Sequence, residues 1–303
     1  MKRIIFFGLI LAAILFTSCM QEKIETSENR IAMHTLISIR AVGIDSKIAV
    51  DRSFERIHEL ETIFKEDLTK IETNSGKFVD VHDETFKLLE ISQKISQDTN
   101  GAFDVTIGAA LSIWNFKEEK IPTPEEIDAA KNLIGFNELK LDKKNHRVMI
   151  IRDGIKLGFG AIGKGFAADE VRKIFDEYNI DSGLIQIGSS TISAVGKKSD
   201  GSKWTVGIKN PRDVENIIEV VELEDQTIST SGDYEKFFIR DGVRYHHILD
   251  PKTCMPVQNG ISSVYVIVPN SVDNAGSISD AYSTACFVTG EQVYQTKIFY
   301  GDD

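Results

Sequence analysis

Asp280 and Thr284 carry the side chains whose types and spacing best suit metal chemistry. They lie four residues apart, so on a helix they share one face. A carboxylate beside a hydroxyl offers hard oxygen ligands, which suit Mg²⁺. In the simpler interpretation, Asp280 caps a helix N-terminus and Thr284 bonds back to its own backbone. On these two residues alone, the simpler interpretation is favoured.

A glycine-rich segment, Gly158-Phe159-Gly160-Ala161-Ile162-Gly163-Lys164-Gly165, follows an expected strand and opens an expected helix. Free backbone N–H groups and the positive end of the helix dipole favour an anion at such a place. Glycine also lets the backbone approach a phosphate, and Lys164 would neutralise it. Tight packing of strand against helix explains the glycines equally well, and the segment is not a Walker A loop.

Two adjacent histidines, His246 and His247, lie in an expected strand. Neighbouring side chains of a strand point to opposite faces, so we do not expect both to bind one metal. One of them would face a cleft, where a neutral imidazole can act as a general base near neutral pH. A purely structural role is the more common alternative for a single histidine.

The loop of residues 101–106 combines an aromatic ring, Phe103, with a carboxylate, Asp104, that we expect to be exposed. The ring could stack on a planar ligand. A buried Phe103 is the alternative, and it is the more common arrangement.

Helical spacing of apolar residues predicts the elements that must position these groups. We expect helices over residues 53–69, 83–96, 161–178 and 279–288, and a helix start at Thr123 with Pro124 in the first turn and Glu126 completing a capping box. Alternation and β-branched residues predict strands over residues 31–42, 183–196, 204–208, 217–223, 234–239 and 264–268, with short strands within 139–157. Interleaved helices and strands indicate an α/β (mixed α+β) fold.

The bulk composition is that of a globular protein able to bury a sizeable core. The 303 residues are 42% hydrophobic and 27% charged, which fits one large domain or two intimately packed lobes. The formal net charge of −11 argues against non-specific binding to nucleic acid.

The N-terminus resembles a bacterial lipoprotein signal, which we assign to residues 1–18. Lys2 and Arg3 precede an apolar stretch too short to span a membrane, and small residues then lead to Cys19. Acylation of Cys19 would anchor an exported, periplasmic protein to a membrane. Plain secretion is the alternative. Residues 19–30 are expected to form a polar tether and residues 31–303 the domain. Cys254 and Cys286 would form one disulfide or remain buried free thiols.

Taken together in chain order, these segments resemble the ApbE-like family of FAD:protein FMN transferases. The resemblance runs from about Met33 to Gly290. Its motifs are Met33-His34-Thr35, Gly101 to Thr106, Gly160 to Gly165, Trp204 to Ile208 with Pro211, Ser229 to Tyr234, His247-Ile248-Leu249-Asp250-Pro251, and Asp280 to Ala285. Each motif alone is weak, whereas six or seven in the family's order are highly specific.

The resemblance implies an ApbE-like fold and a set of roles. Mg²⁺ would be bound by Asp280, Thr284 and the carbonyl of Ala161, and the catalytic residues would be His247 and Asp280. The FAD site would be lined by Met33, Ala102, Phe103, Asp104, Lys164 and Ile248. FAD would be the substrate, and the acceptor would be a threonine of a partner protein, expected to be a subunit of a membrane redox complex.

Departures from the family pattern lie at four places. Gly158 stands where the family usually has Asp, and His34 where it has Gly. Gly188-Ser189-Ser190 replaces a Gly-Gly-Asn or Gly-Gly-Asp motif. Residues 294–303 do not resemble the family's ending, so the C-terminus is expected to be shorter. Two alternatives therefore stay open: an FAD pyrophosphatase that releases FMN and AMP, and a non-catalytic flavin-binding lipoprotein.

Overall fold

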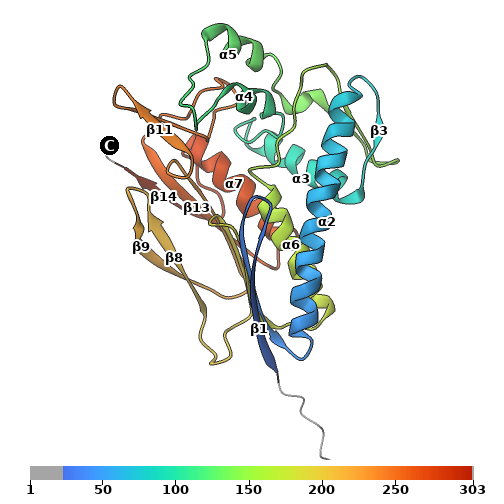
Figure 1. The fold of residues 1–303 in the computed structure, drawn as a ribbon, viewed down its shortest axis with the longest axis vertical. Helices are drawn as coiled ribbons and strands as arrows, with labels where there is room; N and C mark the ends of the chain where they lie inside the picture. The colour runs from blue at the N-terminus through green and yellow to red at the C-terminus, as the bar shows by residue number, and fades with distance from the viewer. Residues whose placement is uncertain (1–22, 302–303) are drawn as a thin grey trace, which may run out of the picture.

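A single antiparallel sheet runs through the molecule (Figure 1). The computed structural model describes residues 23–301, and within them seven strands pair in the order β1-β2-β6-β7-β10-β13-β14. Their bounds are β1 Ile24–Ala32, β2 Thr35–Gly43, β6 Ser182–Ile187, β7 Thr191–Val195, β10 Gln226–Gly232, β13 Ile261–Pro269 and β14 Gln295–Tyr300. The order is not sequential between β2 and β6, so the helices that intervene in the chain can pack against the sheet.

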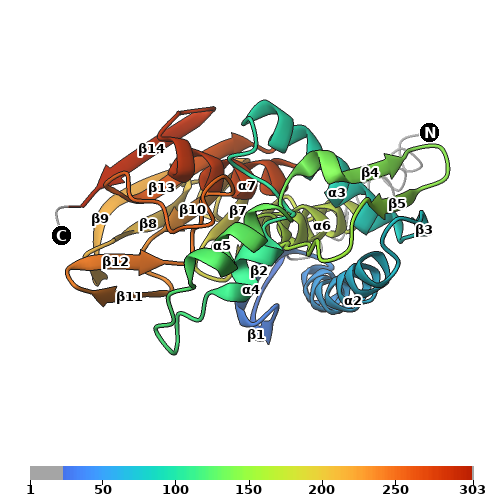
Figure 2. The same ribbon diagram turned by 90° about the horizontal axis from the view of Figure 1, so that it is seen from above.

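Helices cover one face of this sheet, as the two views show (Figures 1 and 2). The helices are α2 Ser46–Thr73, α3 Asp83–Asp98, α4 Gly108–Ile113, α5 Pro124–Lys131, α6 Gly163–Glu177 and α7 Ala275–Thr289, with a short 3₁₀ turn η1 Phe136–Glu138. Side chains of α2 and α6 share one core with β2 and β6, and α7 shares another with β13. The two cores bury the apolar stripes that helical spacing predicts.

Smaller sheets complete the body. The hairpin of β8 Trp204–Asn210 and β9 Asp213–Leu223 packs its apolar side on β7, β10 and β13 through a third core. Two further sheets are formed by β3 Val79–Asp80, β5 Arg147–Ile150 and β4 Leu139–Asp142, and by β11 Phe237–Arg240 with β12 Val243–His246. The last hairpin leads directly into His247.

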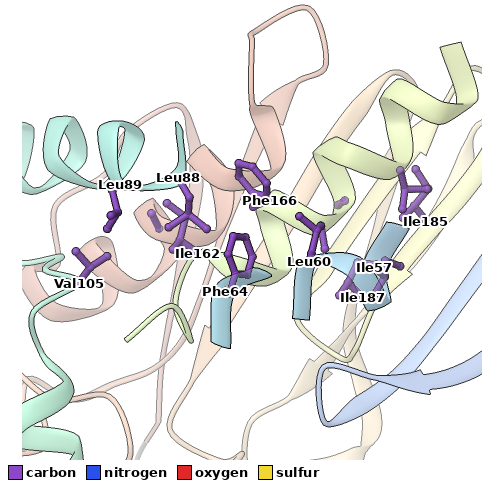
Figure 3. Packing of buried hydrophobic residues seen from close by; sticks show 14 of the residues in the cluster. Ile57, Leu60, Phe64, Leu88, Leu89, Val105, Ile162, Phe166, Ile185 and Ile187 are labelled. Atoms are coloured by element: carbon purple, nitrogen blue, oxygen red, sulfur yellow. The ribbon is translucent and has the colours of Figure 1, made fainter. Parts of the chain in front are cut away.

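The contact between α2 and α6 is the part of the core that bears on the site. Phe64 of α2 and Phe166 of α6 meet edge to face with ring centroids 5.7 Å apart, beside the buried Leu60 and Ile162 (Figure 3). Phe64 also meets Phe159 at 5.2 Å. The glycine-rich segment that precedes α6 is therefore fixed against the long helix α2.

The mixed α/β architecture is confirmed, and so are the expected helices. α3 begins at Asp83 as predicted, and the capping box joins Thr123 to Glu126 in both directions at the start of α5. α2 and α7 extend beyond the predicted segments. Cys254 and Cys286 are buried free thiols, so the disulfide alternative is wrong.

Two predicted strands were wrong because each is a hairpin. Residues 31–42 divide into β1 and β2 at a turn formed by Met33 and His34, and residues 183–196 divide into β6 and β7 after Gly188, whose φ is +67°. Alternation continues through a tight turn, so periodicity alone does not mark it. The strand expected at the two histidines is β12, which ends at His246. β3, β10 and β14 were not predicted.

The expected tether of residues 19–30 needs correction from Ile24 onward. β1 pairs with β2 along its whole length, from Ile24 opposite Gly43 to Ala32 opposite Thr35. An edge strand needs hydrogen-bond partners on one side only and tolerates polar side chains. The polar composition of this segment therefore did not distinguish a strand from a tether. At the other edge, β14 pairs with β13, so residues 295–300 supply a strand where none was expected. The expected signal segment and Cys19 lie outside the described residues.

Within residues 23–301, every helix is too short or too polar to cross a bilayer.

Candidate active site

The site is built where α6 and α7 cross with their backbones in contact. A Cβ on Gly165 would lie 2.1 Å from the carbonyl oxygen of Gly276, and a Cβ on Gly276 would lie 2.3 Å from that of Gly165. Only glycine fits at both positions. The close approach places Asp280 of α7 beside the first turn of α6, since a Cβ on Gly165 would also lie 2.8 Å from the Cβ of Asp280.

Asp280 is a buried carboxylate that accepts a hydrogen bond from a backbone N–H group. Its side chain is 3% exposed, and its Oδ2 accepts the N–H of Gly165 at 3.0 Å. Burial raises the pKa of Asp280, and the positive charge of Lys164 opposes that rise. A buried carboxylate without a directly bonded cationic side chain is costly, so a bound cation would stabilise it.

Thr284 lies one turn further along α7, on the same face as predicted. Its Oγ1 is 3.2 Å from the hydroxyl of Ser231 at the end of β10, and Ser231 is also 2.8 Å from the hydroxyl of Ser283. The interpretation of Asp280 as an N-cap is wrong, because α7 begins five residues earlier at Ala275. Instead Asp169 of α6 accepts the N–H groups of Gly276 and Ser277, each at 2.8 Å.

The donor set here suits Mg²⁺ that also binds phosphate oxygens. Among residues 23–301 there is no group of three or more His, Cys, Asp or Glu side chains able to hold a metal ion. A site made of one carboxylate, one hydroxyl and backbone carbonyls leaves most ligand positions to water or substrate, which is the usual arrangement for Mg²⁺. Ala161, whose carbonyl was predicted as a ligand, lies half-buried in the turn that enters α6.

The glycine-rich segment turns tightly into α6. The N–H of Gly163 donates to the carbonyl of Phe159 at 2.7 Å, and Lys164 Nζ donates to the carbonyl of Gly160 at 3.1 Å. The ammonium of Lys164 therefore stays close to the helix N-terminus, where an anion is favoured. The close packing of Gly165 against α7 confirms the packing interpretation of the glycines. Binding of an anion beside Lys164 stays a prediction.

His247 lies directly after β12, with a buried ring nitrogen that is not hydrogen-bonded. Its N–H donates to the carbonyl of Lys236 at 3.0 Å, and its Nδ1 has no partner among the described residues. Burial, together with the positive charges of Lys236 and Lys164, lowers the pKa of His247 to about 4. The imidazole is therefore neutral at pH 7 and able to accept a proton.

His246 points elsewhere, as strand alternation predicts. Its Nε2 is 2.8 Å from the carbonyl oxygen of Val257, and its ring meets that of Phe287 edge to face at 5.5 Å. Ile248 is 6% exposed and donates its N–H to Nδ1 of His246 at 3.3 Å. His246 is thus the structural histidine of the pair, and His247 is the one near Lys164.

The loop that carries Ala102, Phe103 and Asp104 is more buried than expected. The exposed fractions are 4%, 3% and 6%, so the expectation of an exposed Asp104 is wrong and Phe103 belongs to the core. Asp104 accepts N–H groups from Thr106 and Phe136, both at 2.8 Å, and these bonds oppose the rise that burial gives its pKa. The loop meets the glycine-rich segment through backbone, since Gly158 donates to the carbonyl of Val105 at 2.7 Å.

Met33 completes the arrangement from the β1–β2 turn. Its Cε lies 3.7 Å from where a Cβ of Gly163 would be, so its side chain reaches the first turn of α6. Met33 and Asp280 thus meet the first turn of α6, which carries Lys164. Thr284 follows Asp280 by one turn of α7, and the charge of Lys164 reaches His247. Asp104 stabilises the loop of residues 101–106. Ser231 and Asp169 were not predicted as site residues from the sequence. The one sequence feature that could have indicated Ser231 is its place in the motif Ser229-Thr230-Ser231-Gly232.

Comparison with known proteins gives one consistent result. A model described as the ApbE family matches residues 33–297. An FAD:protein FMN transferase of Treponema pallidum is 35% identical over 221 residues, 68% of this chain and 59% of that protein. One of Salmonella typhimurium is 29% identical over 283 residues, 88% of this chain and 79% of that protein. The chain thus spans less than two thirds of the Treponema relative.

Solved structures agree with these relatives. The ApbE protein of Thermotoga maritima superposes with a TM-score of 0.80 at 31% identity, covering 88% of this chain and 87% of that one. The flavin transferase ApbE of Vibrio cholerae superposes with a TM-score of 0.77 at 26% identity, covering 88% and 87%.

Proposed function

This chain belongs to the ApbE family, and we propose that it is a Mg²⁺-dependent FAD:protein FMN transferase that moves FMN from FAD to a threonine of a partner protein. Its relatives are named as FAD:protein FMN transferases. The observation that carries the proposal is the buried Asp280, set beside the N-terminus of α6 with Thr284 one turn further on. A carboxylate and a positive helix end side by side suit a divalent cation and a pyrophosphate together.

The reaction exchanges the phosphoanhydride bond of FAD for a phosphoester bond to threonine. The threonine hydroxyl oxygen attacks the FMN phosphorus of FAD, and the bond from that phosphorus to the bridging oxygen breaks. AMP leaves with the bridging oxygen, and the hydroxyl proton passes to a base. The products are AMP and FMN joined to threonine through a phosphoester.

Lys164 and the first turn of α6 would bind the pyrophosphate. The ammonium of Lys164 is held near Gly160, and the helix dipole adds partial positive charge at the same place. Met33, Ala102, Phe103, Asp104 and Ile248 would complete the FAD site. Because Ala102, Phe103 and Asp104 are almost fully buried, we propose that they act mainly through the shape and backbone of their loop.

Asp280, Thr284 and the carbonyl of Ala161 would hold Mg²⁺. An ion held there would supply positive charge that stabilises phosphate oxygens. Ser231 would keep the Thr284 hydroxyl oriented, since the two oxygens are 3.2 Å apart.

His247 would take the threonine proton. Its imidazole is neutral, and its Nδ1 has no competing partner among residues 23–301. The bound phosphates are anionic, so they would raise the pKa of His247 and make it a stronger base in the complex. Asp280 would then serve catalysis as a metal ligand rather than as the base.

Export and lipid anchoring complete the proposal. Acylation at Cys19 would hold the enzyme at a membrane on the periplasmic side, near an acceptor that we expect to be a subunit of a membrane redox complex. The acceptor threonine must reach His247, at the end of the β11–β12 hairpin.

Product analysis tests the function against its alternatives. Protein beginning at Cys19 is incubated with FAD, with Mg²⁺ or EDTA, and with or without a threonine-bearing acceptor domain, and the nucleotides are separated by HPLC. The proposal requires AMP only with Mg²⁺ and FMN retained on the acceptor. Free FMN and AMP without acceptor would instead indicate a pyrophosphatase, and intact FAD in every sample would indicate a flavin carrier.

A further inference from the structure

The turn between β1 and β2 is made of residues that are poorly suited to it. Met33 and His34 have φ values of 49° and 58°, both in the left-handed region. A two-residue hairpin turn with two positive φ values favours Asn-Gly or similar pairs, because other side chains are strained there. Something outside the turn must therefore help to hold it.

Glu61 of α2 provides that help. Its Oε1 accepts the N–H of Met33 at 2.6 Å. A hydrogen bond to a charged acceptor is stronger than one between neutral groups, so it favours this backbone geometry. The bond joins residues 28 positions apart and ties the tip of the hairpin to the helix.

The same stretch of α2 also packs against the glycine-rich segment and the start of α6. Leu60 is fully buried, and Phe64 packs on Phe166 of α6 (Figure 3). Phe64 also packs on Phe159 of the glycine-rich segment. One turn of one helix thus contacts both the Met33 turn and the entry to α6. Glu61 sets the position of the turn relative to that entry.

We propose that Glu61 is a positioning residue for FAD binding, which holds the strained Met33–His34 turn so that the Met33 side chain covers the first turn of α6. The inference rests on the proposed function only for the identity of the ligand. That Glu61 positions Met33 is a statement about the protein alone, and it can be tested without FAD.

The test uses variants of the full mature chain. Glu61→Ala removes the acceptor, and Glu61→Gln keeps an oxygen at the same place. Asp67→Asn is the matched control, because Asp67 of the same helix also accepts a backbone N–H, that of His82 at 2.9 Å, and not that of Met33. Two quantities are measured for each: the hydrogen-exchange rate of the Met33 amide without FAD, and the dissociation constant of FAD by flavin fluorescence.

We expect Glu61→Ala to accelerate exchange at Met33 and to weaken FAD binding about tenfold, as loss of one charge-assisted hydrogen bond would. Glu61→Gln should keep most of the Met33 amide protection and most of the FAD affinity. Asp67→Asn should change neither the exchange rate at Met33 nor the FAD affinity. Adding His34→Gly to Glu61→Ala should restore FAD binding, since glycine adopts the turn without strain.

Two results would overturn the inference: faster Met33 exchange with unchanged FAD affinity, or equal loss of affinity in Glu61→Ala and Asp67→Asn. Failure of the wild-type chain to bind FAD would overturn the proposed function instead, and the Met33 exchange rates would still decide whether Glu61 positions Met33.

Discussion

At the scale of single residues, Asp280 and His247 respond in opposite ways to their surroundings. Asp280 is buried and His247 is half-buried, both near Lys164. Loss of solvent moves their pKa values in opposite directions, because it disfavours the charged form of each. Burial disfavours the charged carboxylate of Asp280, and a bound cation would offset that cost. His247 is neutral and available as a base.

The first prediction concerns metal and stability. Burial raises the pKa of Asp280 above its ordinary value of 3.8, so the folded metal-free protein holds that proton more tightly than the unfolded chain does. This contribution to stability is present at acid pH and is lost as the pH rises through the folded pKa. At pH 7, Mg²⁺ should therefore raise the melting temperature of the wild-type protein. Asp280→Asn should abolish that increase in calorimetry, and an undiminished increase would rule out Asp280 as a ligand.

The second prediction concerns pH and rate. With a pKa of about 4, free His247 stays neutral through neutral pH, so kcat/KM for FAD should be level and fall only as the pH approaches about 4. A fall centred near the ordinary histidine value of 6.5 would contradict the burial argument. His247→Gln should lower kcat for AMP release by about a hundredfold while leaving FAD affinity unchanged. His246→Gln is not a suitable control because His246 supports Ile248.

Sequence reasoning at this scale succeeded where partners are neighbours in the chain. Asp280 and Thr284 share a helix face by spacing alone, and strand alternation separates His246 from His247. Glu61, Asp169 and Ser231 act on residues far away in the chain, so spacing could not reveal them. Asp104 was expected at the surface because a carboxylate usually lies there, whereas backbone N–H groups of Thr106 and Phe136 compensate its burial.

At the scale of elements, the crossing of α6 and α7 determines the geometry of the site. The glycines at the crossing let Asp280 accept the N–H of Gly165, so the metal-binding side chain and the anion-binding helix end are set by one contact. The long helix α2 positions the Met33 turn through Glu61 and the glycine-rich segment through Phe64.

The third prediction tests that crossing. In Gly165→Ala, the new methyl group would lie 2.1 Å from a backbone oxygen, so the helices must separate. We expect a loss of about 1–3 kcal/mol in the free energy of unfolding by urea, together with loss of Mg²⁺-dependent turnover. Gly160→Ala is the matched stability control, because a Cβ there meets nothing within 4 Å. Equal stability of the two variants would refute the close crossing.

Elements were predicted well where their ends carry local signals. The capping box at Thr123 and the start of α3 are examples. Both hairpins were read as single strands because alternation continues across a tight turn, and the β1–β2 turn lacks the usual Asn-Gly pair. β14 was missed because its pairing with β13 is a long-range contact.

At the scale of the whole molecule, the β1–β2 hairpin separates the site from the chain's entry into the fold. Ile24 lies at one end of β1, and the turn beside α6 lies at the other (Figure 1). Nine residues of strand span about 30 Å. A lipid at Cys19 would therefore act at a distance from the chemistry.

The fourth prediction follows from that separation. Cys19→Ala should move the protein from the membrane fraction to the soluble periplasmic fraction without changing FAD affinity or AMP release on a soluble acceptor domain. Protein that stays on the membrane would contradict lipid anchoring. Soluble protein with weakened FAD binding would contradict the independence of anchor and site.

The most direct test of the central claim is mass spectrometry of a threonine-bearing acceptor domain after incubation with FAD and this protein. Wild type with Mg²⁺ should add one FMN to a threonine, whereas EDTA or Asp280→Asn should prevent the addition. Equal labelling in all three samples would contradict the metal site at Asp280. An unlabelled acceptor, with AMP released in the wild-type sample, would contradict transfer and favour hydrolysis of FAD.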